Sequence, residues 1–538
     1  MPRAQSHILL ALILVAAFIA RVWGIGFGLP FVHARPDELL VVVKALGFFT
    51  ADLNPRFFDY PALYLYLVGL LFFVYYAFGR VAGWFTSAAH FVSGTHGRWQ
   101  ALYLIGRGAS AVFGTLTVLW VHRIASALFT RSVGLLASLF LALTFLHVRD
   151  SHYATTDATM TFFIVSATFA LVQLHQARRR SHAIWAGVFA GLAMGTKYNA
   201  ALLVAPMIVV EALHAWPLRH DPVTALRRTN LPLMLLLMGA TFFATSPYLL
   251  LDYKTALRDF RALQESMSVG MTPPELLGPG WIYHVRFSLL HGLGLPLLTA
   301  SLAGIGLMAW RYPETALLLI SFPAAYYVVA GASANVFVRY MIPVLPFLCI
   351  FAAYLVDAVA DVAARLGHVR QSVAAAAIGL IVIAPSAWSV VQFDTLLARE
   401  DSRVVAARWI ESNVPRGASI FVTGNAYGHP PLEDRNDPKY RLIAFDYRAN
   451  NFIEGRVRFL DEPDWIVVQR SALPYSHIPQ LVIDMLPRYL LVNVIRAADL
   501  DVPGNVYDIQ DAFFLPYGGF KGIRRPGPNL EIYQRRRQ

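Results

Sequence analysis

The sequence predicts a mostly α-helical, polytopic membrane protein that ends in a small α/β domain. Of its 538 residues, 57% are hydrophobic and only 14% are charged. Soluble proteins carry about 25% charged residues. Apolar segments recur from residue 7 to residue 391, and from Asp394 onward the chain is polar. We therefore expect a transmembrane domain over residues 1–393 and a water-soluble domain over residues 394–538.

The apolar segments have roughly the length that a membrane helix needs. A span takes about 20 residues, and on this basis the sequence predicts about 11 spans. The first segment lacks a small-residue cleavage site around Arg21, so we expect it to remain as a signal anchor. The spans are expected near residues 7–27, 99–122, 133–148, 158–175, 182–197, 199–215, 231–250, 284–309, 314–331, 338–360 and 371–391.

Arginine-rich loops set the expected topology. With the N-terminus in the cytoplasm, the loops at residues 178–180 and 219–228 fall inside, as the positive-inside pattern requires. These loops also explain the net charge of +12 without nucleic acid as a partner, and anionic lipid is the expected contact. The sequence thus predicts a multi-pass protein of the cell (inner or plasma) membrane whose C-terminal domain is extracytoplasmic.

The first outside loop, residues 28–98, is expected to contain interfacial helices. Residues 60–78 are apolar enough to span, but a span there would turn the later arginine clusters outward. We therefore place this segment in the outer leaflet, with a true span as the alternative. Apolar residues also recur at helical spacing over residues 37–50, which predicts an interfacial amphipathic helix.

The C-terminal residues mix helix and strand signals. Residues 402–413 predict a helix, and short apolar runs predict strands at residues 419–423, 442–445, 465–469, 489–495 and 530–533. This pattern indicates a small extracytoplasmic α/β domain, and it contains no catalytic signature.

Two neighbouring carboxylates, Asp37 and Glu38, follow the first span. Acidic side chains beside lipid are costly and often functional. Pro36 suits the first position of a helix, so both acids are expected in the first helical turn, where the helix dipole favours ionised carboxylates. An ionised carboxylate near an acceptor hydroxyl takes its proton. The alternative is that the two acids only complement the helix terminus.

The loop at residues 149–157 brings Arg149, His152 and Asp157 to the same predicted side of the membrane. Asp157 either caps the following helix or binds the acceptor. It is also a candidate to hold a divalent cation together with Asp37. This loop is therefore the second candidate part of an active site.

Two cations complete the predicted outer layer. Lys197, followed by Tyr198, lies at a tight outer turn and either snorkels to the headgroups or binds a phosphate. Arg339 begins a later span and is either a membrane-edge anchor or a two-pronged phosphate ligand. Acids and cations in one layer suit a reaction that activates a nucleophile and stabilises an anionic leaving group.

Several common catalytic motifs are absent from the sequence. It has no Walker loop, no dinucleotide-binding glycine fingerprint after a strand, no His-Glu-x-x-His run and no Gly-x-Ser-x-Gly elbow. Nucleotide-driven pumps and the common hydrolases therefore lose support.

Short motifs around the candidate residues resemble the GT-C class of integral membrane glycosyltransferases. The resemblance is to the branch that holds the protein O-mannosyltransferases and the aminoarabinose transferases, and it spans residues 1–420. The matching pieces are Arg-Pro-Asp-Glu at residues 35–38, Phe-Asp-Tyr-Pro-Ala-Leu-Tyr at 58–64, the loop at 149–157, Gly-Leu-Ala-Met-Gly-Thr-Lys-Tyr at 191–198 and Arg-Tyr-Met-Ile-Pro-Val-Leu-Pro at 339–346.

The resemblance implies an inverting sugar transfer from a polyprenyl-phosphate donor. The sugar, a hexose or a pentose, would pass to a glycolipid, polysaccharide or protein acceptor on the extracytoplasmic side. Asp37 would be the general base, supported by Glu38, and Asp157 would be a second acid facing the cavity. Lys197 and Arg339 would bind the lipid phosphate.

One position departs from the family pattern. Members often have histidine before the proline of the first motif, whereas this chain has Arg35, which becomes a further candidate to contact phosphate. The other residues that we expect to line the substrate cavity are Tyr60, Arg149, His152 and Tyr198.

Two other classes of function stay open at this stage. A lipid-linked sugar transporter or flippase would place polar or broken helices near the bilayer midplane. A non-catalytic homologue would bind lipid and scaffold a partner through its C-terminal domain. No cofactor is certain: two acids and His152 could hold a divalent cation, but their spacing matches no recognised ligand pattern. The sequence names neither the sugar nor the acceptor.

Overall fold

The computed structural model describes residues 3–50, 52–93, 99–269, 277–367, 369–432 and 439–536. The chain forms two compact units. Unit 1 comprises Met1–Val22 and Leu40–Val391, and unit 2 comprises Trp23–Leu39 and Gln392–Gln538. The predicted fold class is confirmed, because unit 1 is helical and unit 2 holds a small sheet. The units differ from the predicted domains in one respect, since residues 23–39 group with the C-terminal residues.

Unit 1 is built almost entirely of helices, and two of them, α2 and α21, continue across the boundary to unit 2. Its helices are α1 (Arg3–Val22), α2 (Glu38–Gly47), η1 (Phe48–Thr50), α3 (Leu63–Val81), α4 (Ala88–Ser93), α5 (Trp99–Leu128), α6 (Arg131–Ala142), α7 (Phe145–Asp150), α8 (Thr156–Ala177), α9 (Arg180–Thr196), η3 (Tyr198–Leu203), α10 (Val204–Ala215), η4 (Trp216–Leu218), α11 (Pro222–Arg228), α12 (Leu231–Thr245), α13 (Tyr248–Leu251), α14 (Tyr253–Val269), α16 (Gly280–Tyr283), η5 (His284–Leu289), α17 (Leu290–Leu293), α18 (Leu295–Arg311), α19 (Pro313–Ala332), η6 (Val338–Val344), α20 (Leu345–Gly367) and α21 (Gln371–Leu397).

Each predicted span corresponds to one or more helices. Fewer helices than expected are long and apolar enough to cross a membrane on their own. Among the described residues, 8 helices are long and apolar enough to cross a membrane, or 9 if the bent pair α16–α17 and α18 is one span. The predicted number of about 11 was higher because α6, α9 and α12 are shorter than a standard span. α3, which we placed in the interface, passes the test.

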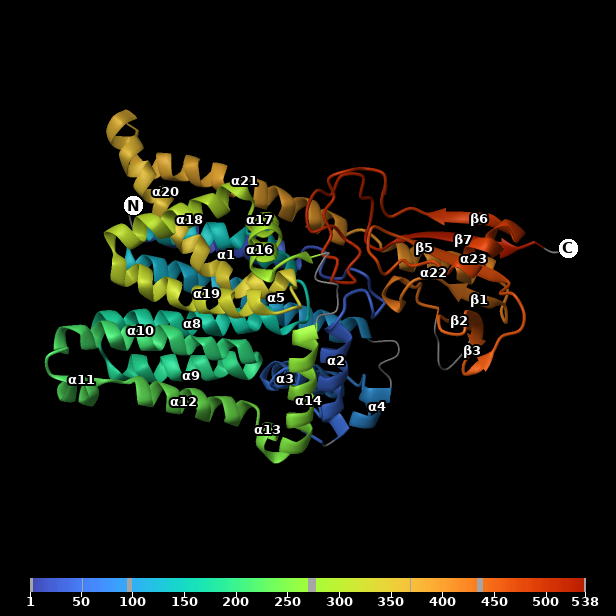
Figure 1. The fold of residues 1–538 in the computed structure, drawn as a ribbon, viewed down its shortest axis with the longest axis horizontal. Coiled ribbons are helices and arrows are strands. Elements are labelled where there is room, and N and C mark those ends of the chain that lie inside the picture. Colours follow the sequence, from blue (N-terminus) through green and yellow to red (C-terminus); the bar gives the residue numbers. More distant parts are fainter. Residues whose placement is uncertain are drawn as a thin grey trace. The chain divides into compact units, whose positions relative to one another are not determined.

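Figure 1 shows how the first outside segment and the spans are arranged within unit 1. α8, α9, α10 and α12 run side by side, and α14 crosses their ends at a steep angle. α3 is seen almost end-on in this view, so it does not run parallel to these four helices. The interfacial placement predicted for residues 60–78 stays a prediction. α14 itself was missed, because no helix was expected between the predicted spans at residues 231–250 and 284–309.

Close packing in the bundle depends on small residues. Gly187, Gly191 and Gly195 recur every fourth residue on α9 and face α12. A Cβ atom at Gly187 or Gly191 would lie only 2.7 or 2.6 Å from the backbone oxygens of Met234 and Met238. This is the small-residue seam that lets two membrane helices approach closely.

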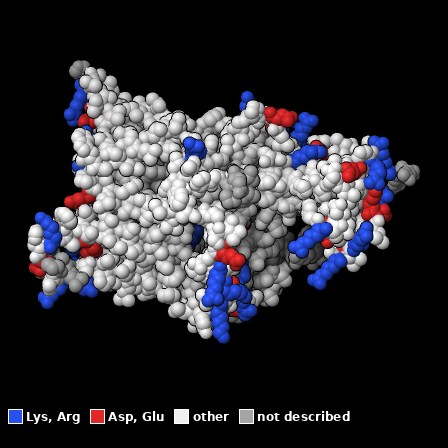
Figure 2. Space-filling view, in the orientation of Figure 1, with Lys and Arg blue, Asp and Glu red and all other residues white. Residues whose placement is uncertain are grey.

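The surface of unit 1 matches a membrane environment. Figure 2 shows a broad area over the helices that is almost free of charged side chains, while lysines and arginines gather near α11 and on α14. Many large apolar side chains on the long helices are exposed, for example Ile8, Phe73 and Ile381. Such an apolar surface is expected where lipid replaces water.

Unit 2 contains a seven-stranded mixed sheet. Its order is β4-β3-β2-β1-β5-β7-β6, with β1 parallel to β2 and β5 and the other neighbours antiparallel. Helix α22, which packs on one face with Ile410 and Ala406, and all five predicted strands are present. The elements are α22 (Ser402–Asn413), β1 (Ser419–Val422), η7 (Ala426–Gly428), β2 (Arg441–Asp446), β3 (Asn451–Glu454), β4 (Val457–Arg458), β5 (Trp465–Arg470), α23 (Gln480–Met485), η8 (Leu486–Arg488), β6 (Tyr489–Ile495) and β7 (Asn529–Arg535).

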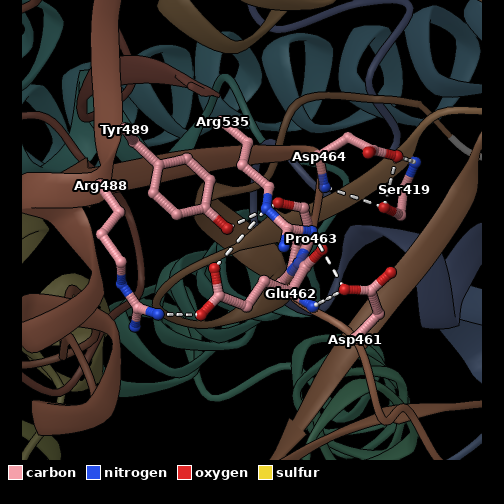
Figure 3. A network of polar contacts seen from close by, with 8 residues as sticks. All are labelled: Ser419, Asp461, Glu462, Pro463, Asp464, Arg488, Tyr489 and Arg535. Atoms are coloured by element: carbon pink, nitrogen blue, oxygen red, sulfur yellow. Dashed lines mark hydrogen bonds and ion pairs between the residues drawn. The ribbon is translucent and has the colours of Figure 1, made fainter. Parts of the chain in front are cut away.

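A polar network connects the loop before β5 to the ends of β1, β6 and β7 (Figure 3). The Asp464 carboxylate accepts hydrogen bonds from the amide and the hydroxyl of Ser419, at 2.8 and 2.7 Å. Arg535 donates to Asp461 at 3.0 Å, and Tyr489 donates its hydroxyl hydrogen to the carbonyl of Pro463 at 2.6 Å. Every group drawn has a partner within the network, so this cluster has a structural role.

Candidate active site

A short and largely buried ion pair joins two candidate residues of unit 1, Lys197 and Asp157. Lys197 Nζ lies 2.8 Å from Asp157 Oδ1, and the two side chains are only 12% and 3% exposed. Asp157 lies in the first turn of α8, and Lys197 is the residue at which α9 ends. Because the helices are antiparallel neighbours, both helix dipoles favour these charges at this end of the pair.

The surroundings of Lys197 leave it suited to an anion. Its Nζ also lies 5.3 Å from the centre of the Tyr340 ring, at cation–π distance. An ammonium group has three N–H donors, and among the described residues its one hydrogen-bond acceptor is Asp157. Two donors are therefore available to a phosphate.

The loop predicted at residues 149–157 is buried rather than solvated. Arg149 Nη1 lies 2.9 Å from Asp150 Oδ2, and the two side chains are 2% and 1% exposed. His152 Nδ1 lies 2.9 Å from the carbonyl of Val148. The same short segment thus places an arginine, an acid and a histidine directly before α8.

The structure brings two of the resembling motifs together. The Tyr198 hydroxyl donates a hydrogen bond to the carbonyl of Phe58 at 2.9 Å, and the Phe58 amide donates to Asp259 of α14 at 3.2 Å. Burial and the Asp259 carboxylate raise the pKa of Asp59 in the same loop. Tyr60 is half-buried beside Phe57. This loop is therefore held against η3 and α14.

Arg339 lies in η6, one residue before Tyr340. Its guanidinium carbon is 4.1 Å from the centre of the Phe337 ring, so the side chain stacks on an aromatic face. η6 packs against α8, the helix that carries Asp157.

The two acids of the first loop lie where the chain passes from unit 2 to unit 1. Glu38 is buried and is the first residue of α2, whereas Asp37 precedes the helix with a φ of 72°. The expectation that Pro36 begins the helix and that both acids lie in its first turn was therefore wrong. A left-handed conformation at Asp37 is incompatible with the helix, so α2 starts at Glu38, two residues after the expected start at Pro36.

Arg35 is held by the C-terminal part of the chain within unit 2. Its Nη1 lies 2.6 Å from Asp511 Oδ1, and both side chains are almost completely buried. The Arg35 guanidinium also lies over the Phe513 ring at 5.6 Å. Its predicted role as a phosphate contact stays a prediction.

Asp37 belongs to one compact unit, while Lys197 and Arg339 belong to the other. The predicted pocket that joins these three residues therefore stays a prediction. Within the described part of the chain, no group of three His, Cys, Asp or Glu side chains is arranged to hold a metal ion.

Sequence reasoning missed three residues that contact the candidate site residues. Tyr340 was visible as the aromatic neighbour of Arg339 in its motif. Asp511 precedes a strongly apolar run, which is an unusual place for an unpaired acid and was the available signal. Tyr427 gave no signal in the sequence, and burial together with the charge of nearby Asp37 raises the pKa of its phenol.

Comparisons with known proteins identify the fold. Residues 80–249 match the family model described as dolichyl-phosphate-mannose-protein mannosyltransferase. No curated protein sequence matches the chain. The structure is similar to the archaeal oligosaccharyltransferase AglB from Archaeoglobus fulgidus, in complex with an inhibitory peptide and a dolichol-phosphate. That match has a TM-score of 0.53 and 14% identity, and it covers 78% of this chain and 62% of AglB.

A second similar structure is matched over a larger share of its own length. ArnT from Cupriavidus metallidurans bound to undecaprenyl phosphate matches with a TM-score of 0.52 and 16% identity, over 81% of this chain and 87% of that one. Apo ArnT matches with a TM-score of 0.50 and 15% identity over 98% of both chains. The predicted resemblance to the GT-C glycosyltransferases is confirmed, and the chain is a multi-pass membrane protein with that fold.

Proposed function

We propose that this protein transfers a sugar from a polyprenyl-phosphate carrier to an acceptor hydroxyl on the extracytoplasmic side of the membrane. The acceptor is a glycolipid, a polysaccharide or a protein. The two similar structures were described with dolichol-phosphate and with undecaprenyl phosphate, which supports a polyprenyl phosphate as the ligand class.

In the proposed reaction Asp37 is the general base. Its carboxylate takes the proton of the acceptor group, and the acceptor atom then forms a bond to the anomeric carbon of the sugar. The bond between that carbon and the phosphate oxygen breaks on the opposite face, so the configuration inverts. The electron pair of the broken bond leaves with the polyprenyl phosphate.

The observation that carries this proposal is the buried pair of Lys197 and Asp157. The Asp157 carboxylate accepts one hydrogen bond from the Lys197 ammonium at 2.8 Å, and the lysine keeps donors for another anion. A fixed cation in a low-dielectric site stabilises the charge that develops on a leaving phosphate. Arg339 is the second proposed phosphate ligand.

The proposal is tested first in cells. A deletion strain should accumulate one lipid-linked sugar and lose one glycosylated product, and mass spectrometry of the lipid and glycan pools identifies both. Wild-type protein should reverse these changes, whereas Lys197→Gln should not. The matched control is Lys254→Gln, because Lys254 is exposed at the start of α14. Unchanged pools in the deletion strain would contradict the proposal.

A transporter is distinguished from a transferase by the product. Proteoliposomes that contain the purified protein and the accumulated lipid-linked sugar should form a new covalent glycoside when acceptor is supplied. Movement of the lipid-linked sugar between leaflets without a covalent product would favour the flippase alternative.

A further inference from the structure

The segment before Asp37 is packed into the C-terminal unit. The Phe27 ring meets the Phe513 ring edge-on, with centroids 5.8 Å apart. The Phe31 ring lies 4.9 Å from the guanidinium carbon of Arg403, whose charge is balanced by Asp401 at 2.5 Å. Residues far apart in the sequence thus pack against the segment that precedes Asp37, the proposed catalytic base.

The last of these anchors before Asp37 is the ion pair of Arg35 and Asp511. Its N–O distance is 2.6 Å, and the side chains are 0% and 2% exposed. Two charges buried this completely are tolerated when they are paired and well placed. The ion pair therefore fixes the position of Arg35 relative to the segment that carries Asp511.

The segment that carries Asp511 is itself firmly held. The amide of Asp511 donates to the carbonyl of Asp508 at 3.1 Å, and the amide of Phe513 donates to the carbonyl of Asp511 at 2.7 Å. The hydroxyl of Tyr475, in the loop after β5, donates to the carbonyl of Gln510 at 3.0 Å. The anchor for Arg35 is therefore part of the folded body of unit 2.

Only one residue separates this anchor from Asp37. That residue is Pro36, whose ring fixes its own φ and restricts the backbone of Arg35. Asp37 has a φ of 72°, a left-handed conformation that is uncommon for non-glycine residues, although aspartate adopts it more readily than most. Asp37 and Asp511 are also close enough to Tyr427 that, after burial, their charges raise the pKa of its phenol.

We propose that Asp511 is a positioning residue for the glycosyl transfer: through its buried ion pair with Arg35, it holds Asp37 in the backbone conformation in which its carboxylate acts as the base. This inference rests on the proposed function, in which Asp37 is the general base. It assigns the segment that carries Asp511 an indirect part in catalysis, because a residue 474 positions later than Asp37 in the sequence holds the loop of the proposed base.

The test separates positioning from stability. In the double variant Arg35→Met/Asp511→Leu, both charges are replaced by apolar groups, which is often neutral for stability. We expect this variant to melt like the wild type, and its affinity for undecaprenyl phosphate is measured separately because Arg35 is also a predicted phosphate contact. Its kcat should fall about 10- to 100-fold, because a displacement of about 1 Å at a reacting group costs about this much. KM for the donor should change less than the kcat does.

Rescue by a conservative pair gives a second and independent comparison. Arg35→Lys alone should lower kcat, and Arg35→Lys/Asp511→Glu should recover most of it, because the longer carboxylate reaches the shorter cation. Asp508→Asn is the matched control, since Asp508 is a buried acid of the same segment. Turnover is measured with reconstituted protein and lipid extract from the deletion strain, by mass spectrometry of the product.

The outcomes are distinct for the two proposals. Wild-type kcat in Arg35→Met/Asp511→Leu would overturn the positioning role. If that variant does not fold, equal kcat in Arg35→Lys and Arg35→Lys/Asp511→Glu would overturn it instead. Full turnover in Asp37→Asn, assayed in parallel, would remove the base itself and with it the proposed function. An inactive Asp37→Asn beside a fully active neutral pair would refute only the role of Asp511.

Discussion

Removal of the Lys197 charge should weaken the binding of polyprenyl phosphate, and removal of the Asp157 charge should strengthen it. In the wild type, Asp157 and a bound phosphate share the same ammonium, which lies 2.8 Å from the carboxylate. Lys197→Gln removes the positive charge. Asp157→Asn removes the competing negative charge. The Lys197 ammonium then loses its carboxylate partner, and a bound phosphate takes that place. The two variants therefore have opposite expected effects on the dissociation constant.

The magnitudes follow from the burial of the pair. A hydrogen bond to a charged group contributes about 1.5–3 kcal/mol, and about 1.4 kcal/mol corresponds to a factor of 10 in affinity. The dissociation constant of Lys197→Gln should therefore rise about 10- to 100-fold. Loss of one partner of a buried ion pair costs about 3–5 kcal/mol of stability. Because the side chains are 12% and 3% exposed, we expect Asp157→Asn to approach the lower end of that range without ligand.

Both effects are measured by thermal unfolding of the purified protein during a titration with undecaprenyl phosphate. The ligand stabilises the folded state in proportion to the logarithm of its concentration over the dissociation constant. Asp157→Asn should start from a lower melting temperature than the wild type and gain more from the ligand, and Lys197→Gln should gain less. Lys254→Gln should behave like the wild type. Wild-type affinity in Lys197→Gln, or equal weakening in both variants, would refute the reasoning.

Three other predictions concern the two units. Gly527→Ala should lower the free energy of unfolding by about 1–3 kcal/mol in thermal melts, because Gly527 has a φ of 96° and a Cβ there would lie 2.1 Å from a side-chain oxygen; an unchanged melting temperature would contradict this. A membrane-impermeant maleimide should label Leu460→Cys but not Leu366→Cys in intact cells, since both side chains are exposed and the native Cys349 is buried; the reverse pattern would invert the proposed topology. Burial raises the pKa of Tyr475 to about 12 from 10.0, so its phenol ionises first in the unfolded chain. The free energy of unfolding should therefore fall as the pH rises from 10 to 12. Tyr475→Phe should make this fall shallower in thermal melts at alkaline pH.

Hydropathy correctly predicted the long apolar helices and the apolar strands of the sheet. The spans at residues 99–122 and 338–360 lie within α5 and η6–α20, and the strands at residues 465–469 and 489–495 lie within β5 and β6. α14 was missed because it is amphipathic and polar on average, which in a sequence resembles a loop. Local propensity could not show that it crosses the ends of other helices.

The candidate site was predicted residue by residue but not contact by contact. Lys197 and Asp157 were both selected by their charge at a membrane edge, yet their ion pair depends on the packing of α8 against α9. The pairing of Arg35 with Asp511 joins residues 476 positions apart, and no local pattern encodes such a distance. The left-handed backbone at Asp37 likewise departs from the helix-start signal of Pro36.

The most direct test of the proposed reaction is the transfer rate of Asp37→Asn in proteoliposomes that contain the accumulated lipid-linked sugar and its acceptor. A general base contributes about 100- to 10,000-fold to a rate. Transfer should fall by at least about 100-fold, while the melting temperature and the affinity for undecaprenyl phosphate stay at wild-type values. Transfer at the wild-type rate would show that another group takes the proton of the acceptor.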